Sequence, residues 1–139
     1  MKSIKTLIRV KQREMDALKR QQGILESQRE EIHSIMVGLA NQLMDELKTA
    51  QALPEMAHFF GDYSAAIKKR QDLMHTHLRR VEVELDKLTA QLRERFGEMK
   101  KFELALANWQ KRKDDAAARK AGQEMDEIGI RGFVRRDVS

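Results

Sequence analysis

The chain has 139 residues, of which 35% are charged and 5% aromatic, and its formal net charge is +5. This composition is wrong for a compact globule of that length, because few bulky apolar side chains are available for a thick core. With one proline, seven glycines and no cysteine, the chain is rich in helix-favouring residues and has no disulfide or thiol chemistry. We expect an elongated all-α protein.

The first predicted helix covers about residues 3–52. Its seam positions recur at alternating spacings of three and four, the pattern of a helix that packs against another helix in a coiled coil. They form two sets at heptad spacing: Ile4, Lys11, Leu18, Leu25, Ile32 and Leu39, and Ile8, Met15, Gln22, Arg29, Met36, Leu43 and Ala50. Polar residues interrupt the apolar pattern in the middle, which costs stability but helps to fix the alignment of the helices.

A turn is predicted at residues 53–62. Pro54 stops the first helix, because proline lacks a backbone donor and restricts the residue before it. It also favours one short helical turn from Pro54 to Phe60, which Gly61 would end, and Asp62 would cap the next helix.

The second predicted helix covers about residues 63–121 and has the stronger heptad pattern, sustained from Ile67 to Ala116. Its two sets of seam positions are Leu78, Leu85, Leu92, Met99 and Leu106, and Val81, Leu88, Arg95, Phe102 and Trp109. The heptads end after Ala121. The glycine-containing polar segment 122–139 is predicted to be a flexible tail.

The two helices are predicted to form an antiparallel coiled-coil hairpin over residues 1–121. In the preferred alignment, called the Trp109 register, Ile8 lies opposite Trp109 and Gln22 lies opposite Arg95. The apolar pairs that follow from it are Met15 with Phe102, Leu18 with Met99, Leu25 with Leu92, Ile32 with Leu85, Met36 with Val81, Leu39 with Leu78 and Leu43 with Met74. A shift by one heptad places Arg95 opposite Arg29 or, in the other direction, opposite Met15. Both shifts are disfavoured, because an unpaired charge in an apolar layer costs on the order of a few kcal/mol.

No catalytic, metal or cofactor site is predicted. The chain has no phosphate-binding loop of the GxxxxGK[ST] kind, and His75 and His77 are two residues apart on different sides of a helix. His33 and His58 have no ligand partners at metal spacing. We expect neither enzymatic activity nor a small-molecule substrate.

Two surfaces are candidates for binding a partner. Basic residues gather at the open end of the hairpin, where an acidic protein or a nucleic acid could bind. They are Lys2, Lys5, Arg9, Lys11, Arg13, Lys19 and Arg20 on the first helix, and Lys111, Arg112, Lys113, Arg119 and Lys120 on the second. At the turn, the four bulky residues Met56, Phe59, Phe60 and Tyr63 either close the hairpin over Leu53 and Ile67 or form an exposed docking patch.

The chain resembles the FliJ family of flagellar type III export proteins. The likeness is carried by a weak long helix, a turn, a strong second helix with Tyr63, Ile67 and His77, then Trp109 before basic residues, and the segment Gln123 to Ile128 with Arg131. The resemblance implies a cytoplasmic, non-catalytic stalk that enters the hexameric export ATPase, engages the export gate and escorts export chaperones. It would be peripheral to the membrane through these partners only.

From this resemblance, we expect the open end to approach the ATPase. The residues assigned to ATPase binding are Lys5, Arg9, Arg13, Lys111, Arg112 and Lys113, and those assigned to the export gate are Tyr63, Ile67, Leu73 and His77. Three alternatives remain: the equivalent stalk of a virulence type III secretion system, a basic coiled coil that binds nucleic acid, and a self-assembling parallel coiled coil. No stretch has the roughly 18 uncharged residues of a membrane span, and residues 1–10 do not match a secretion signal.

Overall fold

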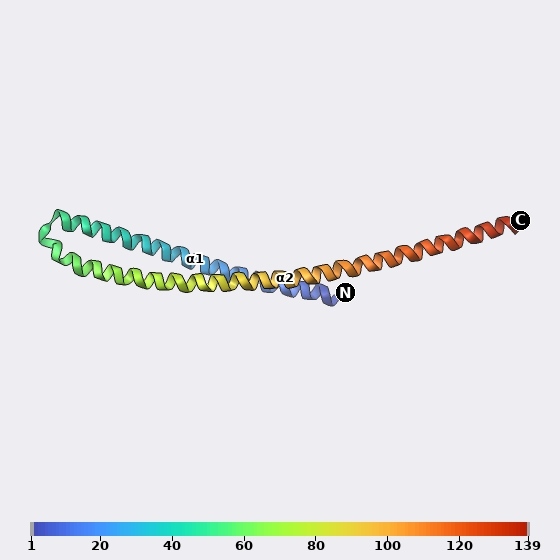
Figure 1. Cartoon of the computed structure of the whole chain (residues 1–139), viewed down its shortest axis with the longest axis horizontal. Coiled ribbons are helices and arrows are strands. Elements are labelled where there is room, and N and C mark those ends of the chain that lie inside the picture. The colour runs from blue at the N-terminus through green and yellow to red at the C-terminus, as the bar shows by residue number, and fades with distance from the viewer. Residues whose placement is uncertain (1, 139) are drawn as a thin grey trace. The chain divides into compact units, whose positions relative to one another are not determined.

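The protein is an all-α, antiparallel two-helix hairpin, as predicted. A computed structural model describes residues 2–138, and the side chains of residues 2–132. Helix α1 spans Lys2–Ala52, the 3₁₀ helix η1 spans Pro54–Met56, and helix α2 spans Ala57–Val138. Figure 1 shows α1 and α2 lying side by side on leaving the turn. No strand occurs between residues 2 and 138.

The chain divides into two units, and each contains a segment of both helices. The turn unit is Glu14–Arg95, and the end unit consists of Met1–Arg13 with Phe96–Ser139. Among the residues whose side chains are described, the buried apolar ones all belong to the turn unit: Met15, Leu39, Ile67, Val81, Leu85 and Leu88. In the end unit the seam is half-buried at positions such as Ile8 and Phe102. In each unit the helices therefore pack along a narrow seam, as expected where only two helices share the burial.

The predicted seam positions are confirmed on both helices. Each residue of the two sets in α1 is buried or half-buried, from Ile4 to Ala50, and so is each residue of the two sets in α2, from Leu78 to Trp109. Most residues between them are exposed. The heptad spacing alone was sufficient for this, because it defines which face of a helix is apolar.

The predicted register is wrong by one heptad. Ion pairs join the helices in both units: Lys11 Nζ lies 2.6 Å from Glu98 Oε2, and Arg95 Nε lies 2.9 Å from Glu14 Oε2. In the Trp109 register, both pairs would be separated by about seven residues, or roughly 10 Å along the helices. The contacts instead place Ile8 opposite Phe102 and Arg95 opposite Met15, an alignment called here the Phe102 register.

The seam charges do not disfavour this register, because both are paired. Arg95 and Lys11 both occupy seam positions, yet each reaches sideways to a carboxylate on the edge of the other helix. The accepting oxygen of Glu14 is itself shielded from solvent. Long cationic side chains can keep their stems in an apolar layer and place their charged ends at its margin. A charge at a seam position therefore need not be buried without a partner.

The turn is shorter than predicted. The Met56 amide donates to the Leu53 carbonyl at 2.9 Å, and Pro54 begins η1, as expected from its missing donor. Helix α2 then starts at Ala57 and continues through Gly61, so Asp62 does not cap a new helix. A glycine inside a helix costs only about 1 kcal/mol relative to alanine, which does not force a break.

Helix α2 also continues past its predicted end near residue 121, to Val138. Side chains from Gln110 to Gly132 are exposed, so the seam ends at Trp109 although the helix does not. Alanine is the commonest residue of this stretch, arginine and lysine are frequent, and all three have high helix propensity. The flexibility expected for residues 122–139 stays a prediction.

Candidate partner-binding surfaces

The six basic residues assigned to ATPase binding all lie in the end unit. Lys5, Arg9 and Arg13 follow one another at spacings of four, which places them along one exposed strip of α1. Lys111, Arg112 and Lys113 are exposed on α2. The Lys113 ammonium lies 5.1 Å from the centre of the Trp109 ring, at cation–π distance. These cations are therefore available to an acidic surface.

The Phe102 register changes how these two groups lie in the end unit. Lys5 is level with about residue 105 of α2, so Lys111 to Lys113 are displaced along the axis by roughly 9 to 12 Å. They have no described residue of α1 opposite them. Trp109 is likewise not beside Ile8, whose partner position is Phe102. The expected juxtaposition of the two basic groups is wrong, because it depended on the Trp109 register.

Sequence reasoning missed two cations beside the α1 strip. In the Phe102 register, Lys100 and Lys101 lie level with Arg9 and its neighbours. Lys101 is exposed, whereas Lys100 bonds Glu103 at 3.0 Å and lies 5.2 Å from the Phe96 ring centre. Only a correct register could have identified Lys101 as part of this surface.

The turn cluster is largely exposed. Phe59 is 56% exposed, Met56 46% and Tyr63 37%, whereas Phe60 is half-buried. Together with Glu46, Thr49 and Ala50 of α1, these residues surround a hollow of about 170 Å³. Ile67, farther along α2, is fully covered at 3% exposed. Of the two interpretations left open by the sequence, exposure favours a patch over a closed cap.

The four residues assigned to the export gate do not form one surface. Leu73 is 53% exposed, Tyr63 is partly exposed and His77 is half-buried, whereas Ile67 lies in the seam. Burial excludes direct contact between Ile67 and a partner while the hairpin is closed. Ile67 lies two heptads before Val81, a spacing that already predicts that Ile67 is buried in the seam.

His77 lines a groove that runs between α1 and α2 in the turn unit. The groove encloses about 300 Å³, and its apolar walls are Ile32 and Ile35 of α1 and Met74 and Val81 of α2. Polar side chains border it: Gln28, Glu31, His77 and Arg80. Tyr63 and His77 are two heptads apart, so they belong to one row along α2. Ile35 and Met74 are groove residues that the assignment from the sequence missed.

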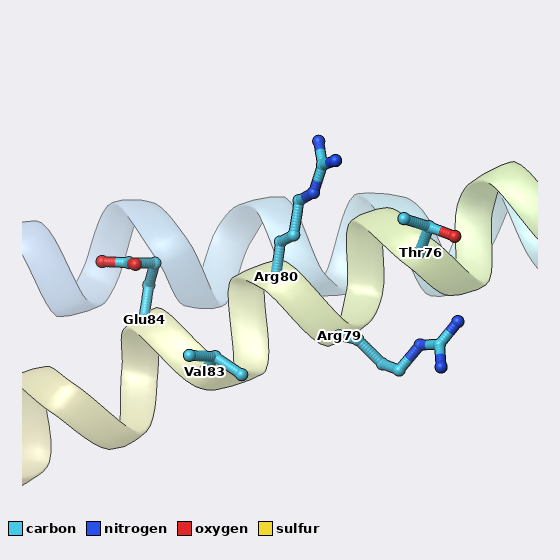
Figure 2. A pocket seen from close by; sticks show the side chains of 5 residues that line it. All are labelled: Thr76, Arg79, Arg80, Val83 and Glu84. Atoms are coloured by element: carbon cyan, nitrogen blue, oxygen red, sulfur yellow. The ribbon is translucent and has the colours of Figure 1, made fainter.

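A second hollow, of about 470 Å³, lies on α2 alone. Figure 2 shows its five lining side chains, Thr76, Arg79, Arg80, Val83 and Glu84, all projecting from one helix. The Arg79 and Arg80 side chains point in different directions, and α1 lies behind them (Figure 2). Because one helix cannot enclose a ligand, this is an open face without the features of a catalytic pocket.

Among the described residues, no group of three or more histidine or acidic side chains is placed to hold a metal ion. Nor does any helix in this part of the chain have a stretch long and apolar enough to cross a membrane. The surfaces that remain are charged strips and small apolar grooves, which are suited to contacts with macromolecules. Fold and surfaces together define a coiled-coil hairpin with exposed charged strips and apolar grooves.

The chain matches no known protein family, no curated protein and no solved structure.

Proposed function

We propose that this protein is a non-catalytic coiled-coil component of a flagellar type III export apparatus. In this role the hairpin binds the hexameric export ATPase through the basic residues of the end unit. The export gate and export chaperones bind along the turn unit, and the protein is cytoplasmic and peripheral to the membrane through these partners. The same architecture would serve a virulence secretion system equally well.

The exposed cations of α2 give this proposal its main support. Lys111, Arg112 and Lys113 lie where no described α1 residue covers them, and the helix continues beyond them. A single helix with a charged surface fits inside a ring of subunits more easily than a helix pair. Its charges can favour one arrangement of the ring, while the hydrolytic residues belong to the ATPase.

The test is co-purification with the candidate export ATPase and measurement of its hydrolysis rate at low salt. We expect a complex and a stimulated rate, both lost in the variant Lys111→Glu, Arg112→Glu and Lys113→Glu. The matched control reverses Lys68, Lys69 and Arg70, which form an equally basic and exposed triplet of α2 in the turn unit. If both charge-reversal variants lose stimulation, or if neither does, residues 111–113 are not the ATPase-binding surface.

A gate contact would use Tyr63, Leu73 and His77. Replacing Tyr63 and Leu73 with alanine should weaken binding to the cytoplasmic domain of the gate protein without affecting the ATPase. Leu104 is 63% exposed and belongs to the end unit, so Leu104→Ala is the control. Equal binding by all variants would remove the gate contact from the proposal.

The alternative is a nucleic-acid-binding protein, which the exposed cations also allow. Its basic residues are diluted by acids, because Asp114 and Asp115 follow Lys113 directly. Binding to DNA with strong salt dependence, and no effect on the ATPase, would favour this alternative.

A further inference from the structure

The seam of this hairpin is compatible with two alignments. In the Phe102 register the apolar layers include Ile8 with Phe102, Leu18 with Leu92, Leu25 with Leu85, Ile32 with Leu78, Met36 with Met74, and Leu43 with Ile67. In the Trp109 register they include Ile8 with Trp109, Leu25 with Leu92, Ile32 with Leu85, Met36 with Val81, Leu39 with Leu78, and Leu43 with Met74. Since a heptad shift returns each helix to the same face, apolar burial discriminates weakly between the two.

Charge pairing discriminates between them strongly. The Lys11–Glu98 pair has side chains 19% and 33% exposed, and the Arg95–Glu14 pair has side chains 34% and 39% exposed. Both pairs exist only in the Phe102 register. Partial burial strengthens them relative to fully exposed pairs, because less water screens the charges.

The Trp109 register needs a longer loop between the helices, and the start of α2 can provide it by unwinding. Residues 57–62 at the start of α2 are exposed except for the half-buried Phe60, so unwinding this turn sacrifices little burial. Gly61 lowers helix propensity here, and Asp62 is placed to cap a helix that begins at Tyr63. The chain then bends over the residues that the sequence itself predicted as a turn.

We propose that the hairpin is a two-state register switch. The ion pairs Lys11–Glu98 and Glu14–Arg95 hold it in the Phe102 register, and their loss releases a slip of one heptad into the Trp109 register. The slip unwinds the start of α2 and moves Lys113 alongside Ile4 in the end unit. Any contact that pulls on the turn therefore alters the basic surface.

Disulfide trapping tests the switch, because the chain has no cysteine of its own. The pair Met36→Cys with Met74→Cys reports the Phe102 register, and Met36→Cys with Val81→Cys reports the Trp109 register. Residues 36 and 88 face each other in neither register, so the pair Met36→Cys with Leu88→Cys reports non-specific opening. Each pair is oxidised in dilute solution, and intrachain bonds are separated by gel mobility without reductant.

In the otherwise unchanged chain, we expect a disulfide to form rapidly between the cysteines introduced at positions 36 and 74. Adding Glu14→Gln and Glu98→Gln should raise the rate for Met36 with Val81 by about tenfold or more, since two charge-assisted contacts are lost. The control for charge is Glu84→Gln with Glu103→Gln, which removes ion pairs within α2 only, at Lys87 and Lys100. That control should leave all three rates unchanged.

Gly61→Ala provides an opposing change. It favours a helix that starts at Ala57, so it should slow disulfide formation between the cysteines at positions 36 and 81. The added methyl group causes no clash, because nothing lies within 4 Å of it. The switch is refuted if the glutamine variant leaves that rate unchanged while circular dichroism shows an intact helical protein. It is equally refuted if Met36 to Leu88 trapping rises to the same extent, because that result indicates opening without a second register.

Discussion

The ion pair between Glu14 and Arg95 should contribute measurably to stability, in contrast to the pairs on the outer faces. Its atoms are 2.9 Å apart, and its side chains are about two-thirds buried, at 39% and 34% exposed. Fully exposed pairs contribute about 0.2 to 1 kcal/mol, whereas breaking a buried pair costs about 3 to 5 kcal/mol. For this intermediate burial we expect Glu14→Gln to destabilise the hairpin by about 1.5 to 2 kcal/mol and a coupling of about 1 kcal/mol.

A double-mutant cycle with Glu14→Gln and Arg95→Gln measures this coupling by urea unfolding, followed by circular dichroism. The matched pair is Glu84–Lys87, which is 3.3 Å long, lies within α2 and has side chains 55% and 65% exposed. Its coupling should stay below about 0.5 kcal/mol. If both cycles give the same coupling, the pair across the seam does not stabilise the register and the reasoning fails. The Glu14–Arg95 coupling should also fall less steeply with salt, because partly buried charges are screened less.

Three further outcomes follow from burial and helix propensity. Leu85 is 7% exposed and Val83 52%, so Leu85→Ala should cost about 2 to 4 kcal/mol in urea unfolding and Val83→Ala less than about 0.5. Gly38→Ala should stabilise by about 0.5 to 1 kcal/mol, measured as a higher urea midpoint, because the position is exposed and nothing lies within 4 Å of the new methyl group. Deleting residues 122–139 should leave the midpoint unchanged within error, since side chains from Gln110 to Gly132 are exposed; a marked drop would mean that this segment packs against the hairpin.

The fold class and the seam could be predicted because they depend on a local and repetitive signal. Every seventh residue returns to nearly the same side of a helix, so positions such as Leu39 and Leu85 identify the buried face without reference to the other helix. The end of α1 was equally predictable, because Pro54 cannot continue a helix. The start of α2 was not. Gly61 and Asp62 favour a helix start locally, but the continuous helix from Ala57 prevails over them.

The candidate surfaces were predictable as exposed residues but not as spatial groups. Lysine and arginine at positions outside the seam are exposed in nearly any coiled coil, so the basic character of Lys5 or Lys111 required no structure. Their proximity required the register, and a one-heptad error displaced the two groups. Ile67 is the reverse case: its heptad position indicates burial, whereas the family resemblance implies a partner surface.

The register error has a general physical origin. Apolar layers repeat at each heptad, so they penalise a shift only at the ends of the seam and at its polar interruptions. The Trp109 register assumes that the charge of Arg95 is confined to its own layer, which makes Gln22 its partner. The side chain instead reaches Glu14 at the margin of the seam. A contact between arginine and a carboxylate is stronger than one between arginine and an amide, because both partners are then charged. The partner of a seam cation should thus be sought among the acidic residues on the edge of the opposing helix, where Lys11 also finds Glu98.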